Sequence, residues 1–132
     1  MLFYRVENKK GEGPYRNTTA LSLSAYLETR LDYSMYLLTH PTPQNDALAK
    51  FIKQFPSYAF EQYIFGFSSI DQLKNWFNTG FDEQYMEKYN FHISIYEIRK
   101  SKFNVAVSEF QTTALKRKLK LVNTIPFTLK DL

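Results

Sequence analysis

The sequence predicts an α+β fold in which one antiparallel or mixed sheet is packed with two to four helices. Segments of alternating apolar and polar residues, typical of strands, occur near both ends of the chain. Segments with helical apolar spacing and capping residues lie between them. The length of 132 residues is that of one domain, so we assign residues 1–132 to a single globular domain.

The clearest predicted strand covers residues 91–98, where every second residue at the start is apolar. Polar residues 100–102 and renewed alternation over residues 103–107 predict a hairpin with this strand. The stretch from Lys116 to Val122 also alternates. It forms either a basic-faced strand or the end of a helix from Thr112, and we favour a strand from Leu119. Two earlier strands are predicted, over residues 2–6 and 63–67.

The clearest predicted helix begins after Ser69, which forms a capping box with Gln72. Its apolar residues recur with helical spacing, and Gly80 is the predicted C-cap. Three further helices are predicted. They cover residues 20–31 after a cap at Thr18 or Thr19, residues 48–55 between Asp46 and Pro56, and residues 82–89.

The composition excludes several kinds of chemistry. There is no cysteine, which excludes disulfides, thiolate metal sites and a cysteine nucleophile. The two histidines, His40 and His92, are far apart in sequence and lack metal-ligand spacing, so we assign no metal. Glycine-rich nucleotide motifs and a nucleophile elbow are also missing. We therefore assign no catalytic residue and no cofactor from the residues alone.

Neither a signal segment nor a run long enough to span a bilayer is found in the sequence. We therefore expect no membrane association and take the cytoplasm as the compartment. The expected partners are proteins or, as an alternative, nucleic acid.

The charge and the aromatic residues point to the surface. The formal net charge is +4, and a cluster of cations near the C-terminus accounts for it. We call these residues the basic edge: Lys116, Arg117, Lys118 and Lys120. Such a run either protects an edge strand from aggregation or contacts phosphates. The sequence also holds 12 Phe, 10 Tyr and 1 Trp, and exposed tyrosines favour protein contacts. The candidate partner-binding residues are Tyr33, Tyr36, Tyr58 and the basic edge.

Several motifs are similar to those of small bacteriophage and prophage proteins. They are the opening Phe-Tyr-Arg-Val-Glu-Asn, the following Gly-x-Gly-Pro-Tyr-Arg, His-Pro-x-Pro from His40, and Phe-Gly-Phe-x-Ser from Phe65. The resemblance extends to about Ile98. It implies a small phage-type protein, for which the compartment would be the host cytoplasm, but its motifs name no function.

A second pattern resembles ADP-ribosyltransferase-like folds. Arg5 precedes a serine that opens a helix, Ser69, and both precede Glu97 on a later strand. The resemblance implies that Arg5 holds NAD and that Glu97 stabilises the cation developing at the ribose. The competing role of Arg5 is an ion pair with Glu97 or Glu7 at a sheet edge.

Three functional hypotheses follow. The first is a phage-type binding protein that inhibits or modulates a host machine, such as a defence system, by protein–protein contact. The second is an NAD-dependent ADP-ribosyltransferase that uses Arg5, Ser69 and Glu97. The third is a nucleic-acid-binding protein that uses the basic edge. We favour the first, and the resemblance to phage proteins decides between them.

Overall fold

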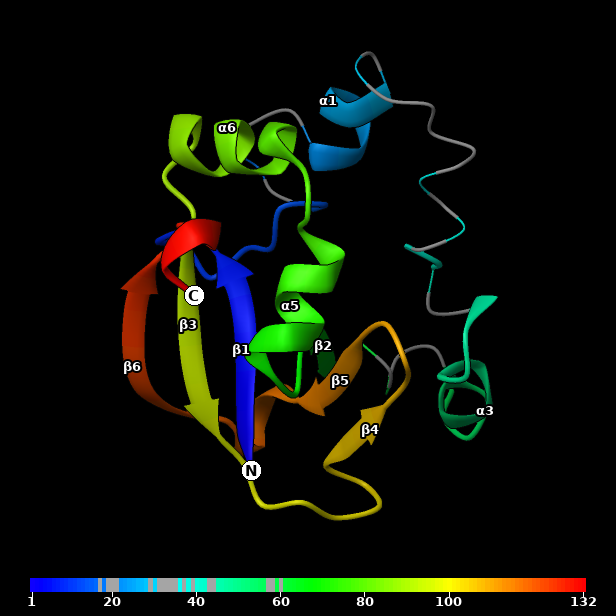
Figure 1. Cartoon of the computed structure of the whole chain (residues 1–132). Helices are drawn as coiled ribbons and strands as arrows, with labels where there is room; N and C mark the ends of the chain where they lie inside the picture. The colour runs from blue at the N-terminus through cyan, green and yellow to red at the C-terminus, as the bar shows by residue number, and fades with distance from the viewer. Residues whose placement is uncertain are drawn as a thin grey trace.

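The computed structural model (Figure 1) has helices packed against an antiparallel sheet and a second, smaller sheet beside it. The predicted α+β class is confirmed. The structure describes residues 1–16, 18, 22–28, 30, 36, 38, 40–42, 45–56, 59 and 61–132, without the side chain of residue 131.

The first sheet contains β1 (Leu2–Glu7), β3 (His92–Glu97) and β6 (Lys120–Pro126), in the order β1-β3-β6. All its pairings are antiparallel. The second sheet contains β2 (Tyr63–Gly66), β5 (Thr112–Leu115) and β4 (Val105–Val107), in the order β2-β5-β4, and is antiparallel as well.

A single antiparallel bridge between Tyr4 and Phe67 joins the two sheets, with both backbone hydrogen bonds at 2.8 Å. The bridge links β1 to the residue that follows β2. Gly66 permits this approach, because a Cβ at that position would lie 2.5 Å from the carbonyl oxygen of Tyr4 and 2.6 Å from the ring of Phe3. A glycine is therefore required where the two sheets meet.

Two helices pack against the first sheet, the first of them on one of its faces and the second across the end where β1 finishes and β3 begins (Figure 1). They are α5 (Ile70–Trp76) and α6 (Gly80–Lys88), which follow β2 directly (Figure 1). Their buried side chains, including Leu73 and Tyr85, form the main core with Val6 and Ile93 from the sheet. This face of β1 and β3 carries apolar residues at every second position, as burial of one sheet face requires.

The second sheet is covered on both faces. One face packs against the first sheet through Phe3, Ile64 and Ala114. The other packs against α3 (Ala49–Ile52) through Phe51, Tyr63 and Leu115. The remaining helix, α1 (Leu23–Glu28), contributes Leu23, Tyr26 and Leu27 to the main core.

The predicted hairpin between residues 91–98 and 103–107 is wrong. β3 pairs with β1 and β6, whereas β4 pairs with β5. β5 follows β4 after four residues and supplies a nearer partner. The predicted strand from Leu119 is confirmed as β6. The alternative of a helix from Thr112 is excluded, because Thr112–Leu115 is a buried strand.

Two predicted caps are also corrected. Gly80 does not end the preceding helix but begins α6, and Thr79 caps α6 in a capping box with Asp82. At α1 the hydroxyl of Ser22 accepts a hydrogen bond from the backbone N–H of Ala25 at 3.3 Å. Thr18 instead bonds to Glu12, and the other predicted cap, Thr19, lies outside the described residues.

Candidate functional site

The transferase-like residues Arg5, Ser69 and Glu97 do not share a cavity. In the β1–β3 register Arg5 lies opposite Ser94, whereas Glu97 lies opposite Leu2. Side chains alternate between the faces of a sheet, so Arg5 and Glu97 project from opposite faces. The hydroxyl of Ser69 accepts the backbone N–H of Gln72 at 3.0 Å and serves as the N-cap of α5.

Arg5 instead belongs to a buried polar cluster. Its Nε donates to Oε2 of Glu7 at 3.1 Å, and its Nη1 donates to the backbone carbonyl of Phe65 at 2.7 Å. The predicted ion pair with Glu7 is thus confirmed, and its two side chains are only 14% and 8% exposed. Burial lowers the pKa of Arg5 from its ordinary value, and the carboxylate of Glu7 opposes that shift.

Tyr96 completes this cluster from β3. Its hydroxyl donates to Oε1 of Glu7 at 2.5 Å. Burial raises the pKa of Tyr96 to about 12, and the hydrogen bond and negative charge of Glu7 act in the same direction. Both carboxylate oxygens of Glu7 therefore have a donor. We call Arg5, Glu7 and Tyr96 the junction cluster, because it links the first sheet to the backbone of β2.

A hollow of about 260 Å³ opens beside the junction cluster. It takes one wall from each sheet and its rim from the turn after β1 and the segment between β5 and β6. We call it the junction hollow, and its lining residues are Glu7, Lys10, Gly11, Ile64, Tyr96, Lys116 and Leu119. Sequence reasoning missed this site, although Arg5 and Glu7 lie two residues apart on one strand and so share a face.

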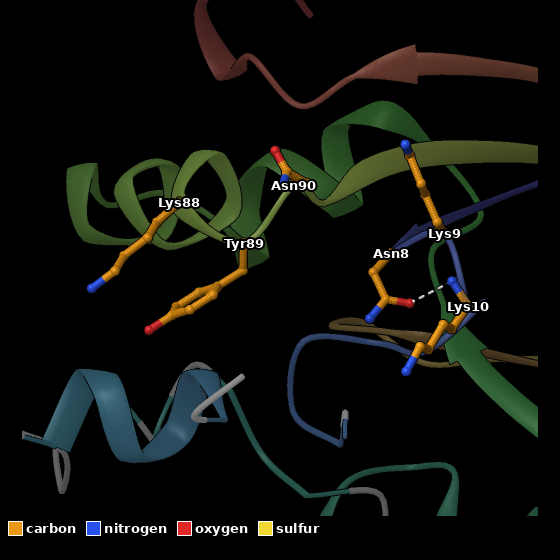
Figure 2. A pocket seen from close by; sticks show the side chains of 6 residues that line it. All are labelled: Asn8, Lys9, Lys10, Lys88, Tyr89 and Asn90. Carbon is orange, nitrogen blue, oxygen red and sulfur yellow. Dashed lines mark hydrogen bonds between the residues drawn. The ribbon is translucent and has the colours of Figure 1, made fainter. Parts of the chain in front are cut away.

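A second hollow, of about 320 Å³, lies between the same turn and the end of α6. We call it the outer hollow (Figure 2). Its lining residues are Asn8, Lys9, Lys10, Lys88, Tyr89 and Asn90. Figure 2 shows Lys9 and Lys88 pointing in different directions, and Nζ of Lys88 lies over the ring of Tyr89, 5.4 Å from its centroid. The three ammonium groups do not converge, which leaves this hollow an open stretch of surface.

The basic edge lies at the border of the first sheet. Its first three residues form a 3-10 turn, η2 (Lys116–Lys118), and its last residue begins β6. All four side chains are exposed. Two large apolar side chains continue the surface, because Leu121 is 54% exposed and Val122 is 48% exposed.

Of the three predicted tyrosines the structure describes only Tyr36, and this residue does not extend the surface. Tyr36 is only 8% exposed, its ring stacks on His40, and its hydroxyl lies 2.6 Å from that of Tyr15. Burial raises the pKa of Tyr15 well above its ordinary value. Tyr36 therefore packs in the core. Tyr33 and Tyr58 lie outside the described residues.

Both histidines have hydrogen-bond partners. The ring nitrogens of His40 face the backbone carbonyls of Tyr36 and Trp76, and Nε2 of His92 lies 3.0 Å from the hydroxyl of Ser94. Among the described residues, no group of three or more histidine or acidic side chains is placed to hold a metal ion. None of the described helices has the length and apolar character needed to cross a membrane.

The fold and its surface therefore define a small α+β protein with an exposed edge strand that is partly apolar and lies beside a cluster of cations. A family model described as Bacteriophage T4 Y00F protein matches residues 1–128. Since the match covers nearly all of the chain, the protein belongs to this phage family, and the resemblance to small phage proteins is confirmed. No curated protein and no solved structure matches significantly. The resemblance to ADP-ribosyltransferases receives no support from the comparisons.

Proposed function

We propose that the protein is a phage-encoded binding protein that modulates a host machine, such as a defence complex, by protein–protein contact in the host cytoplasm. The contact surface is the basic edge together with β6, and the partner is an acidic segment of a host protein. The observation that carries this proposal is the exposure of Leu121 and Val122 directly beside four exposed cations. Apolar side chains with a charged rim are typical of protein-binding surfaces.

β6 is also an edge strand, and an edge strand has backbone groups that can bond to a partner. In the described part of the chain it pairs with β3 alone, so its other edge faces outward (Figure 1). The pairing shifts between Ile95 and Tyr96, which lie opposite Asn123 and Leu121. Val122 is therefore an extra residue in β6, as in a β-bulge. An extended segment of a partner can add to such an edge as a further strand.

Charge determines which partner fits. Among the described side chains the ion pair between Arg5 and Glu7 is the only one within 4.0 Å, so no described carboxylate forms such a pair with the basic edge. The nearest acidic residue in the sheet register is Glu97, which lies opposite Lys120 on the neighbouring strand and leaves the other three cations without a cross-strand partner in that register. A second copy would bring its own cations against these, which disfavours pairing of the protein with itself. An acidic segment gains both the charge attraction and the backbone hydrogen bonds.

The test compares two variants that change the formal net charge by the same amount. In the edge variant, all four residues of the basic edge are changed to Gln. In the control variant, Lys53, Lys88, Lys100 and Lys102 are changed to Gln, and these side chains are also exposed. Each set lowers the formal net charge from +4 to zero. We expect the edge variant to lose a host protein that the wild type and the control variant both retain, with direct binding confirmed using the purified partner.

Val122→Asp is a second variant for the same binding test, and it keeps all four cations of the basic edge. Its carboxylate repels an acidic partner at the centre of the surface, so binding of the purified partner should weaken. Equal capture by the edge and control variants would contradict the proposal. Capture of nucleic acid instead, with a log–log salt slope of roughly −3 for about four phosphate contacts, would replace the proposal with the nucleic-acid hypothesis.

A further inference from the structure

We propose that the junction hollow binds a small phosphate monoester that carries a planar body, a ligand of mononucleotide type. This inference is independent of host-protein binding, although Lys116 lies at the border of both surfaces. It rests on the charge, the lining and the rigidity of the hollow, which are taken in turn below.

The charge of the hollow matches a phosphate monoester. The carboxylate of Glu7 is paired with Arg5 at 3.1 Å and bonded by Tyr96 at 2.5 Å, so its negative charge is already neutralised. Two further cations, Lys10 and Lys116, line the hollow, and neither forms an ion pair within 4.0 Å with a described carboxylate. A phosphate monoester carries a charge of about −1.5 to −2 near neutral pH, which these two ammonium groups can balance.

The lining of the hollow favours an organic body over a simple anion. Ile64, Leu119 and Tyr96 contribute apolar and aromatic surface. The volume of about 260 Å³ is several times the ~30 Å³ that one water molecule occupies in the liquid. An inorganic phosphate ion would leave most of this space to solvent. A flat ring beside Tyr96 would fill it and gain stacking contact.

The junction hollow also has the rigidity that a binding site requires. The side chains of Glu7 and Tyr96 are held by hydrogen bonds that connect β1, β3 and the backbone of Phe65. The turn that supplies Lys10 is fixed as well, because the side-chain oxygen of Asn8 accepts the backbone N–H groups of Lys10 and Glu12. Gly11 completes the turn with a φ of 78°.

The test is calorimetry of the full chain with adenosine monophosphate, inorganic phosphate and adenosine. We expect adenosine monophosphate to bind more tightly than either of the other two. Lys10→Gln and Lys116→Gln should each weaken its binding about fivefold, the effect of one charged contact at a partly exposed site. The matched control is Lys9→Gln, because Lys9 is the sequence neighbour of Lys10 but lines only the outer hollow.

Backbone amide shifts in NMR spectra give a second readout, which also reports whether each variant is folded. Bound ligand should move the signals of Gly11 and Leu119 rather than those of Tyr89 and Asn90. The affinity should fall as the pH drops below about 6, where the phosphate takes up its second proton. The proposal is overturned by an absence of binding at millimolar ligand, by equal weakening in Lys9→Gln, or by adenosine or inorganic phosphate binding as tightly.

Discussion

A single glutamate, Glu7, connects three parts of the fold. It accepts hydrogen bonds from Arg5 on its own strand and from Tyr96 on β3, while Arg5 also bonds to the carbonyl of Phe65. A buried carboxylate and guanidinium are stable only when their hydrogen bonds are satisfied. The junction cluster meets that condition, so these polar side chains hold the two sheets in a fixed relation.

Tyr96 makes the free energy of unfolding depend on pH in the alkaline range. Its pKa is raised from 10.0 to about 12 in the folded protein, so between these values the unfolded chain loses a proton that the folded protein keeps. The stabilisation is complete below pH 10.0 and is lost as the pH rises toward about 12. Urea unfolding across this range should show a steeper fall in the free energy of unfolding for the wild type than for Tyr96→Phe. Equal slopes would mean that Tyr96 titrates as in the unfolded chain.

Gly66 provides a second test at the residue scale. Gly66→Ala places a methyl group 2.5 Å from the carbonyl oxygen of Tyr4, so we expect a loss of about 1–3 kcal/mol in the free energy of unfolding. Gly80→Ala is the control, because nothing lies within 4 Å of a Cβ there. That change should be neutral or stabilise the protein by about 0.4–1 kcal/mol. Chemical denaturation measures both, and equal effects would show that the sheet contact imposes no constraint.

At the scale of elements, α5 is the best-anchored helix. Ser69 caps its first turn, and the side chain of Gln72 bonds to the backbone N–H of Ser68 and to the hydroxyl of Thr112. The same side chain donates to the carbonyl of Ser108 at 2.9 Å. Ser69 and Gln72 therefore connect α5 to the second sheet as well as beginning the helix. The predicted capping box is only half formed, because Gln72 accepts the N–H of Ser68 and not that of Ser69.

Loss of the Ser69 cap should be measurable by itself. Ser69→Ala removes the acceptor for the backbone N–H of Gln72 and should cost about 1 kcal/mol of stability. Asn75→Ala is the control, since Asn75 is exposed within α5 and should change the free energy by less than about 0.5 kcal/mol. Thermal and urea unfolding provide the comparison. A Ser69→Ala variant as stable as Asn75→Ala would show that Gln72 alone holds the helix start.

For the whole molecule, the bridge between Tyr4 and Phe67 leaves β6 and β4 as outer strands, each paired with one neighbour in the described residues. β6 is the longer of the two and exposes Leu121 and Val122. Long edge strands with exposed apolar residues tend to pair with other chains. The basic edge limits that tendency by charge repulsion while leaving the strand accessible to an acidic partner.

This dual role predicts how the charge variants behave alone in solution. The edge variant should self-associate more than the control variant at the same concentration, although both have a formal net charge of zero. Only the edge variant removes the charge repulsion at β6, which is the strand that can pair with another chain. Sedimentation velocity measures the difference, and identical behaviour would attribute solubility to net charge rather than to its position.

The sequence predicted the elements well because their signals are local. The alternation of residues 91–98 and the cap at Ser69 produced β3 and α5. Thr79 and Asp82 have the spacing of a capping box and indicate the start of α6. Gly80 was interpreted as a helix end, because glycine is common at that position. The candidate site was harder to predict, because exposure depends on distant parts of the chain. The basic edge is exposed, whereas Tyr36 packs in the core.

The sequence by itself determined the α+β class, the family and the position of the basic edge, since these depend on composition, periodicity and local motifs. Only the tertiary structure decided which strands pair, that Arg5 and Glu97 face apart, and that Glu7 and Tyr96 meet beside a hollow. The physical reason is that strand pairing joins residues far apart in sequence. The face on which a side chain lies then follows from the register of that pairing.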